Sequence, residues 1–412
     1  MDATPDANLS IDAIALEARH CAANYASLPV VLTRGEGVHL WDVEGRRYLD
    51  FMSAYSAASF GHGHPRLLAA LADQAGRLAL TSRAFHSDQL GRFAQNLCTL
   101  TGMDRMLPMN TGAEAVETAL KAARKWAYTV KRVPADRAEI IVCRHNFAGR
   151  TTTIVGFSSE PQYRAGFGPF APGFREVPFG DIEALAAAIT PDTAAFLVEP
   201  VQGEAGIRVA PAGYLAAAAA LCRRHDVLLI ADEVQTGLGR TGRLLACDHE
   251  GVKPDGLILG KALGGGLLPV SAFLARADVM AVFEPGDHGS TFGGYPLAAA
   301  VASASLDLLV EADLAARASR SGARALQRLR AIRHPAIREV RGLGLLIGID
   351  LDPAWIEARE FCLQLMRHGV LSKDTHDTVV RIAPPLVIDD ADLDRGIDAI
   401  ETVFASLPAF LH

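Results

Sequence analysis

Short apolar runs alternate with helical patterns through the middle of the chain. The runs cover residues 140–143, 196–198, 227–231, 256–259 and 270–274, and most are followed directly by polar residues or glycine. Because consecutive positions in these runs are apolar, both faces of each predicted strand would be buried, as in a mostly parallel sheet. The intervening residues 113–130 and 211–225 have helical patterns. This βαβα order over about residues 50–295 predicts an α/β core.

The pattern changes after residue 295. Longer helical patterns cover residues 297–310 and 314–329, and later helices are predicted at 355–368 and 389–406. Strand patterns lie at 345–351, near 370 and at 379–382. We therefore predict a large α/β domain at residues 46–295 and a small α+β domain at 296–412. Residues 1–45 are too few for a core of their own, so we expect them to pack on the small domain.

Composition narrows the classes of protein to consider. The chain has 412 residues, 50% of them hydrophobic, which is too apolar for disorder. A formal net charge of −7 argues against a basic nucleic-acid-binding surface. The six cysteines are scattered and predict no disulfide framework. Because there is no secretory signal pattern and no run of about 18 apolar residues, we expect a cytoplasmic protein without membrane spans.

Two residues in apolar surroundings are candidates for catalysis. Lys261 is one of only six lysines and follows a predicted buried strand, ahead of a glycine run. Burial disfavours the charged amine and makes it nucleophilic, although the side chain could also extend to solvent. Asp232 directly follows another such strand, where α/β sheets bind ligands, although it could simply cap a helix. Together, an amine and a carboxylate of this kind suggest a pyridoxal phosphate site, in which the lysine forms the Schiff base and the aspartate keeps the ring nitrogen protonated.

Pyridoxal phosphate needs a site that binds its phosphate group, and a substrate with carboxylate groups needs cationic side chains. Thr111, Gly112 and Ala113 precede a strong helical pattern whose first amide groups would favour an anion, although Thr111 and Glu114 also form a capping-box pattern. Residues 288–296 offer two further hydroxyl groups, of Ser290 and Thr291, between glycines. Arg150 follows the predicted strand at 140–143, and Arg381 lies in the predicted strand at 379–382, ahead of a proline turn. Both could bind carboxylates, although each could also be a surface residue.

The sequence resembles the class III, subgroup II, pyridoxal-phosphate-dependent aminotransferases, and within that family the ornithine-specific enzymes. The resemblance covers nearly the whole chain in long, collinear motifs. These are LWDVEGRRYLDF (40–51), GHGHP (61–65), LTSRAFH (80–86), LPMNTGAEAVETALKAARKW (107–126), GFGPFAPGF (166–174), VEPVQGEAG (198–206), IADEVQTGLGRTGR (230–243), LGKALGGGLLPVSA (259–272), HGSTFGGYPLAAA (288–300) and RIAPPLVI (381–388). The resemblance implies fold type I, with a mostly parallel seven-stranded sheet in the large domain.

The resemblance also implies roles for individual residues around the cofactor. Lys261 would form the Schiff base and then move the substrate proton, and Asp232 would pair with the ring nitrogen. Glu199 would lie behind these groups, and the protein would be a homodimer with shared sites. The other cofactor contacts implied are Thr111, with Gly112 and Ala113 at the phosphate; Phe147 on the ring face; Gln235 at the ring oxygen; and Ser290 and Thr291, reaching the phosphate from the partner subunit.

For the substrates, the resemblance implies transfer of the δ-amino group of L-ornithine to 2-oxoglutarate, with pyridoxamine phosphate as the intermediate enzyme form. Tyr25 and Arg150 would hold the α-amino and α-carboxylate groups of ornithine, and Tyr55 would shape the pocket. Glu204 would mask Arg381 in the first half-reaction and release it for 2-oxoglutarate in the second. The products would be glutamate and glutamate 5-semialdehyde, which cyclises to pyrroline-5-carboxylate.

Three places depart from the family pattern. Ala148 stands where ornithine enzymes would be expected to carry a bulky aromatic residue, and residues 24–30 and 372–377 also differ. These changes could widen the pocket or alter selectivity. The donor could therefore be N-acetylornithine, 4-aminobutyrate or another ω-amine instead.

Other classes of function remain as alternatives. GLGRTG (237–242) matches the G-x-G-x-x-G dinucleotide fingerprint, but five residues separate it from the preceding strand and no amphipathic helix pattern follows. His62 and His64, or Cys247 with His249, could suggest a metal hydrolase, without further ligands at recognisable spacing. A relative of these enzymes that has lost activity and serves as a binding module is the third alternative.

Overall fold

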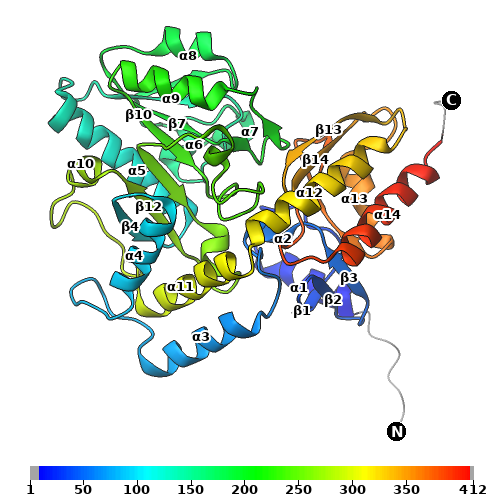
Figure 1. Ribbon diagram of the computed structural model, residues 1–412. Helices are drawn as coiled ribbons and strands as arrows, with labels where there is room; N and C mark the ends of the chain where they lie inside the picture. Colours follow the sequence, from blue (N-terminus) through cyan, green and yellow to red (C-terminus); the bar gives the residue numbers. More distant parts are fainter. Residues whose placement is uncertain (1–8, 409–412) are drawn as a thin grey trace.

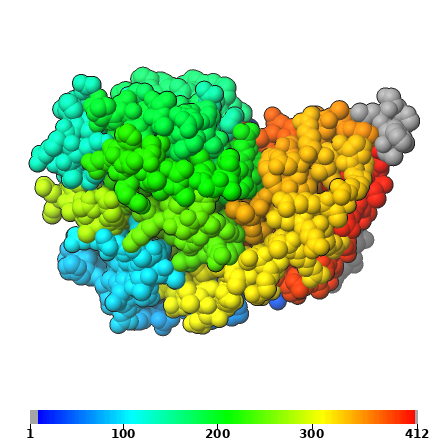
Figure 2. All heavy atoms as spheres, turned by 45° about the horizontal axis from the view of Figure 1, so that its top comes forward, coloured from blue at the N-terminus to red at the C-terminus, as the bar shows by residue number. Residues whose placement is uncertain are grey.

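The computed structural model describes residues 9–408, which form two lobes. Figure 1 shows one lobe built around a large sheet and a second lobe in which three helices pack on a smaller sheet. In the space-filling view of Figure 2, green residues of the first lobe lie against orange and yellow residues along the junction of the two lobes. The site described below involves residues from both lobes.

The large sheet has seven strands and is mostly parallel, which confirms the predicted fold class. The neighbouring strands β11, β10, β7, β5 and β6 pair in parallel, whereas β12 is antiparallel to both of its neighbours. Their carboxyl ends therefore lie at one edge of the sheet. In spatial order the strands are β4 (Arg105–Met109), β12 (Ser271–Ala275), β11 (Gly256–Leu259), β10 (Leu228–Asp232), β7 (Thr193–Val198), β5 (Glu139–Cys143) and β6 (Phe174–Val177).

All five predicted strands are present, with their starts shifted by at most three residues. The strands that the sequence pattern missed, β4 and β6, are the two edges of the sheet. β4 contains Pro108 and begins with the exposed Arg105, and β6 contains two charged residues. Edge strands carry such residues because one side needs no ladder hydrogen bonds, and this removes the continuous apolar run that identifies a central strand.

Helix α5 (Gly112–Trp126) packs on the sheet through the predicted stripe, including the buried Val116, Leu120 and Ala123. The α-helix ends earlier than the pattern predicts, because residues Ala127–Lys131 form a π-helical turn that leaves Val130 half exposed. The other helices of this lobe are α3 (Pro65–Arg77), α4 (Leu90–Thr101), α6 (Thr152–Gly156), α7 (Pro161–Arg164), α8 (Ile182–Ala188), α9 (Tyr214–Arg224), α10 (Ala277–Met280) and α11 (Pro296–Glu311), with 3₁₀ turns at Ala246–Glu250 and Lys261–Gly264 and a short hairpin of β8 (Val201–Gln202) and β9 (Arg208–Val209).

The second lobe is a four-stranded sheet covered by helices. Its strand order is β13–β14–β17–β16, and all of these neighbours are antiparallel. The strands are β13 (Ile337–Leu343), β14 (Leu346–Leu351), β17 (Val379–Ile382) and β16 (Lys373–Thr375), and the helices are α12 (Leu314–Ala331), α13 (Ala358–Arg367) and α14 (Asp390–Ser406).

The N-terminal segment joins the second lobe through a sheet of its own. After α1 (Leu9–His20), strands β1 (Leu32–Glu36), β2 (His39–Asp42) and β3 (Arg47–Asp50) form a meander, and β3 pairs in parallel with β15 (Val370–Leu371). The boundary that we placed at residue 45 falls between β2 and β3, within one sheet. The division of the chain into domains stays a prediction. Residues 1–8 of the first predicted segment and 409–412 of the last lie outside the described residues.

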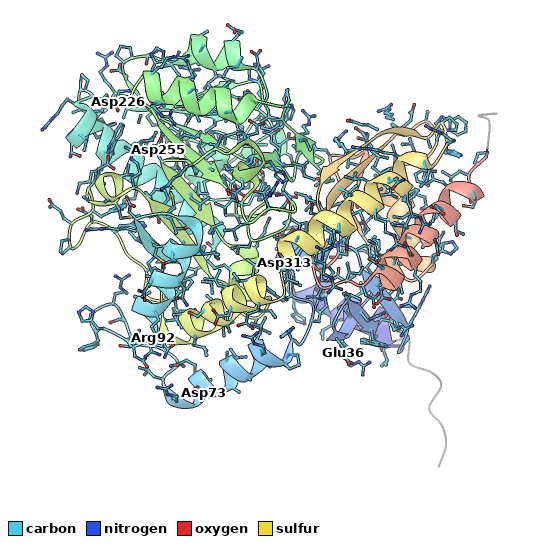
Figure 3. The ribbon with its side chains drawn as sticks, viewed as in Figure 1. Glu36, Asp73, Arg92, Asp226, Asp255 and Asp313 are labelled. Carbon is cyan, nitrogen blue, oxygen red and sulfur yellow. The ribbon has the colours of Figure 1, made fainter. Side chains whose placement is uncertain are left out.

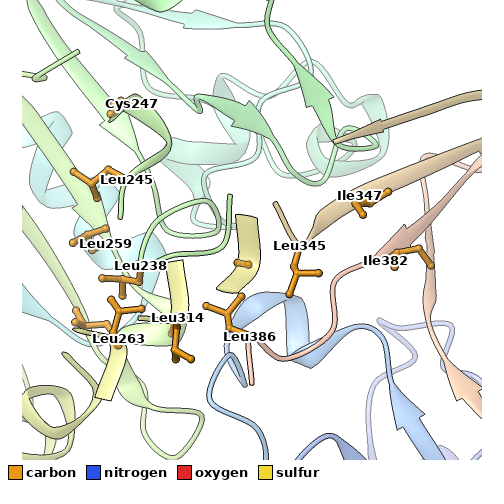
Figure 4. Packing of buried hydrophobic residues seen from close by; sticks show 14 of the residues in the cluster. Leu238, Leu245, Cys247, Leu259, Leu263, Leu314, Leu345, Ile347, Ile382 and Leu386 are labelled. Atoms are coloured by element: carbon orange, nitrogen blue, oxygen red, sulfur yellow. The ribbon is translucent and has the colours of Figure 1, made fainter. Parts of the chain in front are cut away.

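One hydrophobic core runs through both lobes. It includes Leu259 from the large sheet and Ile347 and Ile382 from the small sheet. Figure 4 shows how Leu238, Leu314, Leu345 and Leu386 bring these parts together at the junction. Because apolar side chains from both lobes share this core, the lobes are held in a defined arrangement around the site between them.

Charged side chains project from the outside of the molecule. Glu36 and Asp73, labelled in Figure 3, are 76% and 73% exposed. Among the described residues, no helix has both the length and the apolar character needed to cross a membrane. The cytoplasmic location expected from the sequence stays a prediction.

A glycine in α14 tests this packing. A Cβ atom at Gly396 would lie 1.8 Å from Cζ of the buried Phe51, whereas nothing lies within 4 Å of a Cβ at Gly91 in α4. We expect Gly396→Ala to destabilise the protein by about 1–3 kcal/mol through overpacking. Gly91→Ala should be neutral or stabilise by up to about 1 kcal/mol, because alanine favours a helix. Thermal denaturation of both variants measures this, and equal effects would contradict it.

Candidate active site

The site lies where three neighbouring strands of the large sheet end. Glu199 follows β7, Asp232 is the last residue of β10, and Lys261 stands two residues after β11. Because these strands are parallel and adjacent, their carboxyl ends bring the three side chains to one cavity of about 180 Å³. The cavity is lined by Gly112, Ala113, Phe147, Ala148, Gly149, Glu199, Glu204, Asp232, Val234, Gln235, Thr236 and Lys261.

Lys261 carries the only amine side chain that lines this cavity in the described chain. Burial lowers the pKa of Lys261 to about 8. The charge of Glu204 acts to raise this pKa, and the charge of Arg381 acts to lower it. At neutral pH roughly one tenth of such an amine is unprotonated, far more than for an ordinary lysine. The side chain is therefore a nucleophile at the floor of a cavity.

Asp232 and Glu199 are both buried beside this amine. Burial raises the pKa of Asp232 to about 6, while the amide of Val234 and the charge of Lys261 act to lower it. Asp232 Oδ1 accepts a hydrogen bond of 3.1 Å from that amide. Burial and then the charge of Asp232 raise the pKa of Glu199 to about 8. Two carboxylates in one cavity favour binding of a cationic group there, since a cation offsets their desolvation.

Glu199 also fixes the loop after β5. Its Oε1 accepts a hydrogen bond of 2.9 Å from the amide of Phe147, and its Oε2 accepts one of 3.3 Å from Gly203. Phe147 thereby lines the cavity, and Ala148 follows it with only a methyl group toward the same space. The position for which the family pattern predicts a bulky residue is therefore open in this protein.

The first turn of α5 closes the cavity on another side. Gly112 and Ala113 line it, and amide groups in a first helical turn have no partner within the helix. The capping box is also present, since the Thr111 hydroxyl accepts from the Glu114 amide and the Glu114 carboxylate accepts from the Thr111 amide. Thr111 is thus occupied with the helix, while the two residues after it face a possible anion.

At another side of the cavity Glu204 and Arg381 form a two-bonded ion pair. Arg381 Nη1 and Nη2 donate to the two Glu204 oxygens at 2.9 Å each, and Gln235 Nε2 donates to Glu204 Oε1 at 3.0 Å. Burial alone would raise the pKa of Glu204, but Arg381 lowers it to about 2. The Tyr55 ring lies 5.0 Å from the Arg381 guanidinium. Arg381 is therefore both buried and masked, as the family resemblance implies.

Arg150 is not itself among the residues that line the cavity, but it lies near one of them, Phe147. Its guanidinium lies 3.5 Å from the centre of the Tyr163 ring and 5.6 Å from that of Phe147. The two rings meet edge to face with their centres 6.3 Å apart. Sequence reasoning missed Tyr163, because it lies in the short helix α7, where neither periodicity nor a motif marks it. It also missed Thr375, whose hydroxyl donates to the Glu204 carbonyl at 2.5 Å.

Tyr25, Ser290 and Thr291 do not line the cavity in the described chain, and neither do Thr111, Tyr55, Arg150 and Arg381, whose places are given above. Tyr25 is 76% exposed. The Ser290 hydroxyl accepts a hydrogen bond of 2.8 Å from Asn110 Nδ2, two residues before the start of α5, and Thr291 is exposed. Their predicted contacts with the cofactor of a partner subunit stay predictions.

The dinucleotide-type segment 237–242 and the suggested metal ligands do not have the surroundings that those functions require. Residues 237–242 form turns and are followed by the 3₁₀ turn Ala246–Glu250 instead of the helix that a dinucleotide fingerprint requires. Within residues 9–408, no group of three or more histidine, cysteine, aspartate and glutamate side chains is placed to hold a metal ion. His249 instead contacts the Thr241 carbonyl at 3.0 Å.

The ion pair generates a prediction about stability. Glu204→Gln removes one charge and leaves Arg381, whose side chain is 1% exposed, buried without its partner. We expect the free energy of unfolding to fall by about 2 kcal/mol. This is less than the cost of breaking a fully buried ion pair, because 21% of the Glu204 side chain is exposed. The double variant Glu204→Gln/Arg381→Gln should recover part of this loss, because it leaves no unpaired charge. Denaturation of the wild type, of Glu204→Gln and Arg381→Gln singly, and of the double variant measures the difference, and additive losses would contradict it.

Comparisons with known proteins show the family of this chain. The family model "Aminotransferase class-III" matches residues 20–404. The ornithine aminotransferase of Geobacillus sp. is 55% identical over 96% of this chain and 98% of its own. The Toxoplasma gondii ornithine aminotransferase structure has a TM-score of 0.96 at 47% identity, covering 97% of this chain and 96% of that one. An acetylornithine aminotransferase from Elizabethkingia anophelis has a TM-score of 0.87, also at 47% identity, covering 96% of this chain and 99% of that one. The chain belongs to the class III aminotransferases.

Proposed function

We propose that the protein is a pyridoxal-phosphate-dependent L-ornithine:2-oxoglutarate δ-aminotransferase with a ping-pong mechanism. The observation that carries this proposal is one cavity with the buried amine of Lys261 beside Asp232 and the masked Arg381 at its side. The similarity to ornithine aminotransferases over nearly the whole chain supports the choice of donor.

The residues present fit pyridoxal phosphate. When bound, the cofactor supplies an aldehyde for amines and a cationic ring that withdraws electrons. Asp232, whose pKa burial raises to about 6, gains a counterion if it pairs with a protonated ring nitrogen. Gly112 and Ala113 at the start of α5 would hold the phosphate, and Phe147 would cover a ring face. The assignment of Gln235 to the ring oxygen is compatible with its place in the cavity lining.

Lys261 would also move the proton. Its amine, with a pKa of about 8, can accept a proton from the amine-bearing carbon of the substrate and return it at neutral pH. Glu199, whose pKa burial raises to about 8, holds Phe147 in place through the amide hydrogen bond. These groups would control the protonation of the site without a metal ion being required.

The substrate ends would be distinguished by two arginines. Arg150, which lies over the Tyr163 ring, is the candidate for the α-carboxylate of ornithine. Tyr25 is the candidate for its α-amino group, and Tyr55, which lies against Arg381, would shape the pocket. Arg381 stays paired with Glu204 while the donor is bound, so that the donor's amine end meets no free cation. A dicarboxylate acceptor must replace Glu204 on Arg381, because a buried cation without a partner is costly.

A second donor class is supported by one observation. Ala148 leaves open the space where ornithine enzymes would carry a bulky residue, and this suits a larger amino donor. One similar structure is an acetylornithine aminotransferase, and another, at 31% identity, is an ω-transaminase from Thermomicrobium roseum. Another class III ω-aminotransferase is therefore the alternative.

A homodimer is the expected assembly. Ser290 and Thr291 lie outside the cavity of their own chain, in a segment whose neighbour Phe292 is 47% exposed. Leu78, Leu80 and Phe85 are also exposed, at 45%, 39% and 73%. Large apolar side chains of this kind favour an interface with a second copy, through which the two hydroxyls would reach the partner's phosphate site.

A donor panel tests the proposed reaction. Ornithine, N-acetylornithine, lysine and 4-aminobutyrate are compared as donors to 2-oxoglutarate, with kcat/KM as the readout. We expect ornithine to be preferred by about tenfold or more over each other donor, because N-acetylornithine and 4-aminobutyrate lack the free α-amino group and lysine is one methylene longer. Preference for N-acetylornithine would replace the proposal with the alternative. Lys261→Ala is the control and should abolish turnover.

The pKa of Lys261 predicts how the ligand-free protein takes up its cofactor. The neutral amine is the reactive form, and its fraction rises as the pH passes through a pKa of about 8. We expect the rate of covalent attachment of pyridoxal phosphate to rise from pH 6.5 to about 8.5 and then to level off. Stopped-flow absorbance measures this rate. A rate that continues to rise toward pH 10, as for an unperturbed lysine, would show that burial does not lower this pKa.

A further inference from the structure

The segment GLGRTG (237–242) has a place in the fold that the proposed chemistry does not use. Its backbone turns sharply, with positive φ angles at Leu238, Gly239 and Gly242. These turns aim Arg240 into the protein, where its side chain is fully buried. A dinucleotide loop would instead leave its backbone open to a ligand.

Arg240 joins three distant parts of the chain. Its Nη1 donates to the carbonyls of Leu345 at 3.0 Å and Pro384 at 2.6 Å. Its Nη2 donates to the hydroxyls of Ser53 at 3.2 Å and Ser59 at 2.9 Å. Within the described residues, all of its recorded hydrogen-bond acceptors are neutral oxygens. Burial accordingly lowers the pKa of Arg240 to about 9, although Asp50 opposes this effect.

The two serines bracket a strained turn that carries Tyr55. Residues Ser53–Ser56 (α2) have φ angles of 44°, 46°, 58° and 75°, a left-handed conformation that non-glycine residues avoid. Ser59 Oγ also donates to the Ser56 carbonyl at 2.8 Å, so that Arg240 and Ser59 together hold the end of the turn. Such a conformation persists only where its surroundings impose it.

One of the carbonyl groups that Arg240 contacts lies close to Arg381 along the chain. Pro384 stands three residues after Arg381, and Ser53 Oγ donates to the carbonyl of Ala383 at 2.7 Å. The same arginine therefore holds the turn before Tyr55 and the backbone after Arg381. These two side chains meet at the cavity, with the Tyr55 ring 5.0 Å from the Arg381 guanidinium.

We infer that Arg240 is a positioning residue that holds Tyr55 against Arg381, and that it thereby sets the selection of a dicarboxylate over a monocarboxylate oxo acid. The inference rests on the proposed function only in taking Arg381 as the residue that binds the second carboxylate of the acceptor. Arg240 itself is not among the residues that line the cavity. It acts through four hydrogen bonds that fix the backbone on both sides of this pair.

The test compares two acceptors, 2-oxoglutarate and pyruvate, which differ in the second carboxylate. The variants are Arg240→Lys, Arg240→Met and Ser59→Ala, with Arg243→Met as the control because Arg243 is exposed in the same loop. We expect Arg240→Met to lower the ratio of kcat/KM for 2-oxoglutarate to that for pyruvate by about tenfold or more, because hydrogen bonds to a charged group are lost. Arg240→Lys, which keeps a charged donor, should recover part of the ratio, and Arg243→Met should leave it unchanged.

Ser59→Ala keeps the test decisive if the Arg240 variants do not fold, since it removes one acceptor of Arg240 and the hydrogen bond to the Ser56 carbonyl but leaves the buried guanidinium in place. It should lower the same ratio, through a higher KM for 2-oxoglutarate, without changing the absorbance of the bound cofactor. If folded variants lose thermal stability but keep the acceptor ratio, Arg240 is structural only and the inference is wrong. The amino donor is whichever the panel identifies, so failure of the ornithine assignment would leave this test intact.

Discussion

Burial of several charges in one cavity is the constraint on which the site depends. The pKa of Lys261 responds to Glu204, Arg381, Asp232 and Glu199 together. The two-bonded pair of Arg381 and Glu204 neutralises two of these charges and keeps the pKa of Glu204 at about 2. The amine and the other two carboxylates are left with shifted pKa values. Their protonation therefore depends on the ligand present, and this makes the cavity suited to a cationic ring and to proton transfer.

The fold was predictable where burial is complete. The central strands, buried on both faces, appear in the sequence as unbroken apolar runs, and all five were found. The edge strands β4 and β6 were missed because solvent on one side permits Arg105 and Glu176 within them. The end of α5 was also misplaced, since a π turn at Ala127–Lys131 depends on local backbone hydrogen bonds and leaves no mark on the apolar stripe.

The site was predictable where a strand positions a side chain. Asp232 and Lys261 follow buried strands, so that the sheet topology alone brings them together. Pairing of Glu204 with Arg381 came only from the family resemblance, because 176 residues separate them along the chain and no periodic pattern links them. Tyr163 was missed, since its position depends on how α7 packs beneath Arg150. The places of Ser290 and Thr291 depend on a second chain and lie beyond what one chain can show.

The pairing of β3 with β15 has a consequence for biosynthesis. Leu49 is the parallel partner of Val370, and the Phe51 carbonyl accepts from the Ala383 amide at 2.8 Å. Residues near position 50 therefore leave the ribosome long before their partners are translated. The large sheet can assemble first, while the early segment waits with an unpaired strand edge, which invites incorrect association. The last step of folding would then be closure of the N-terminal sheet around the C-terminal lobe, and this step would also complete the turn that carries Tyr55.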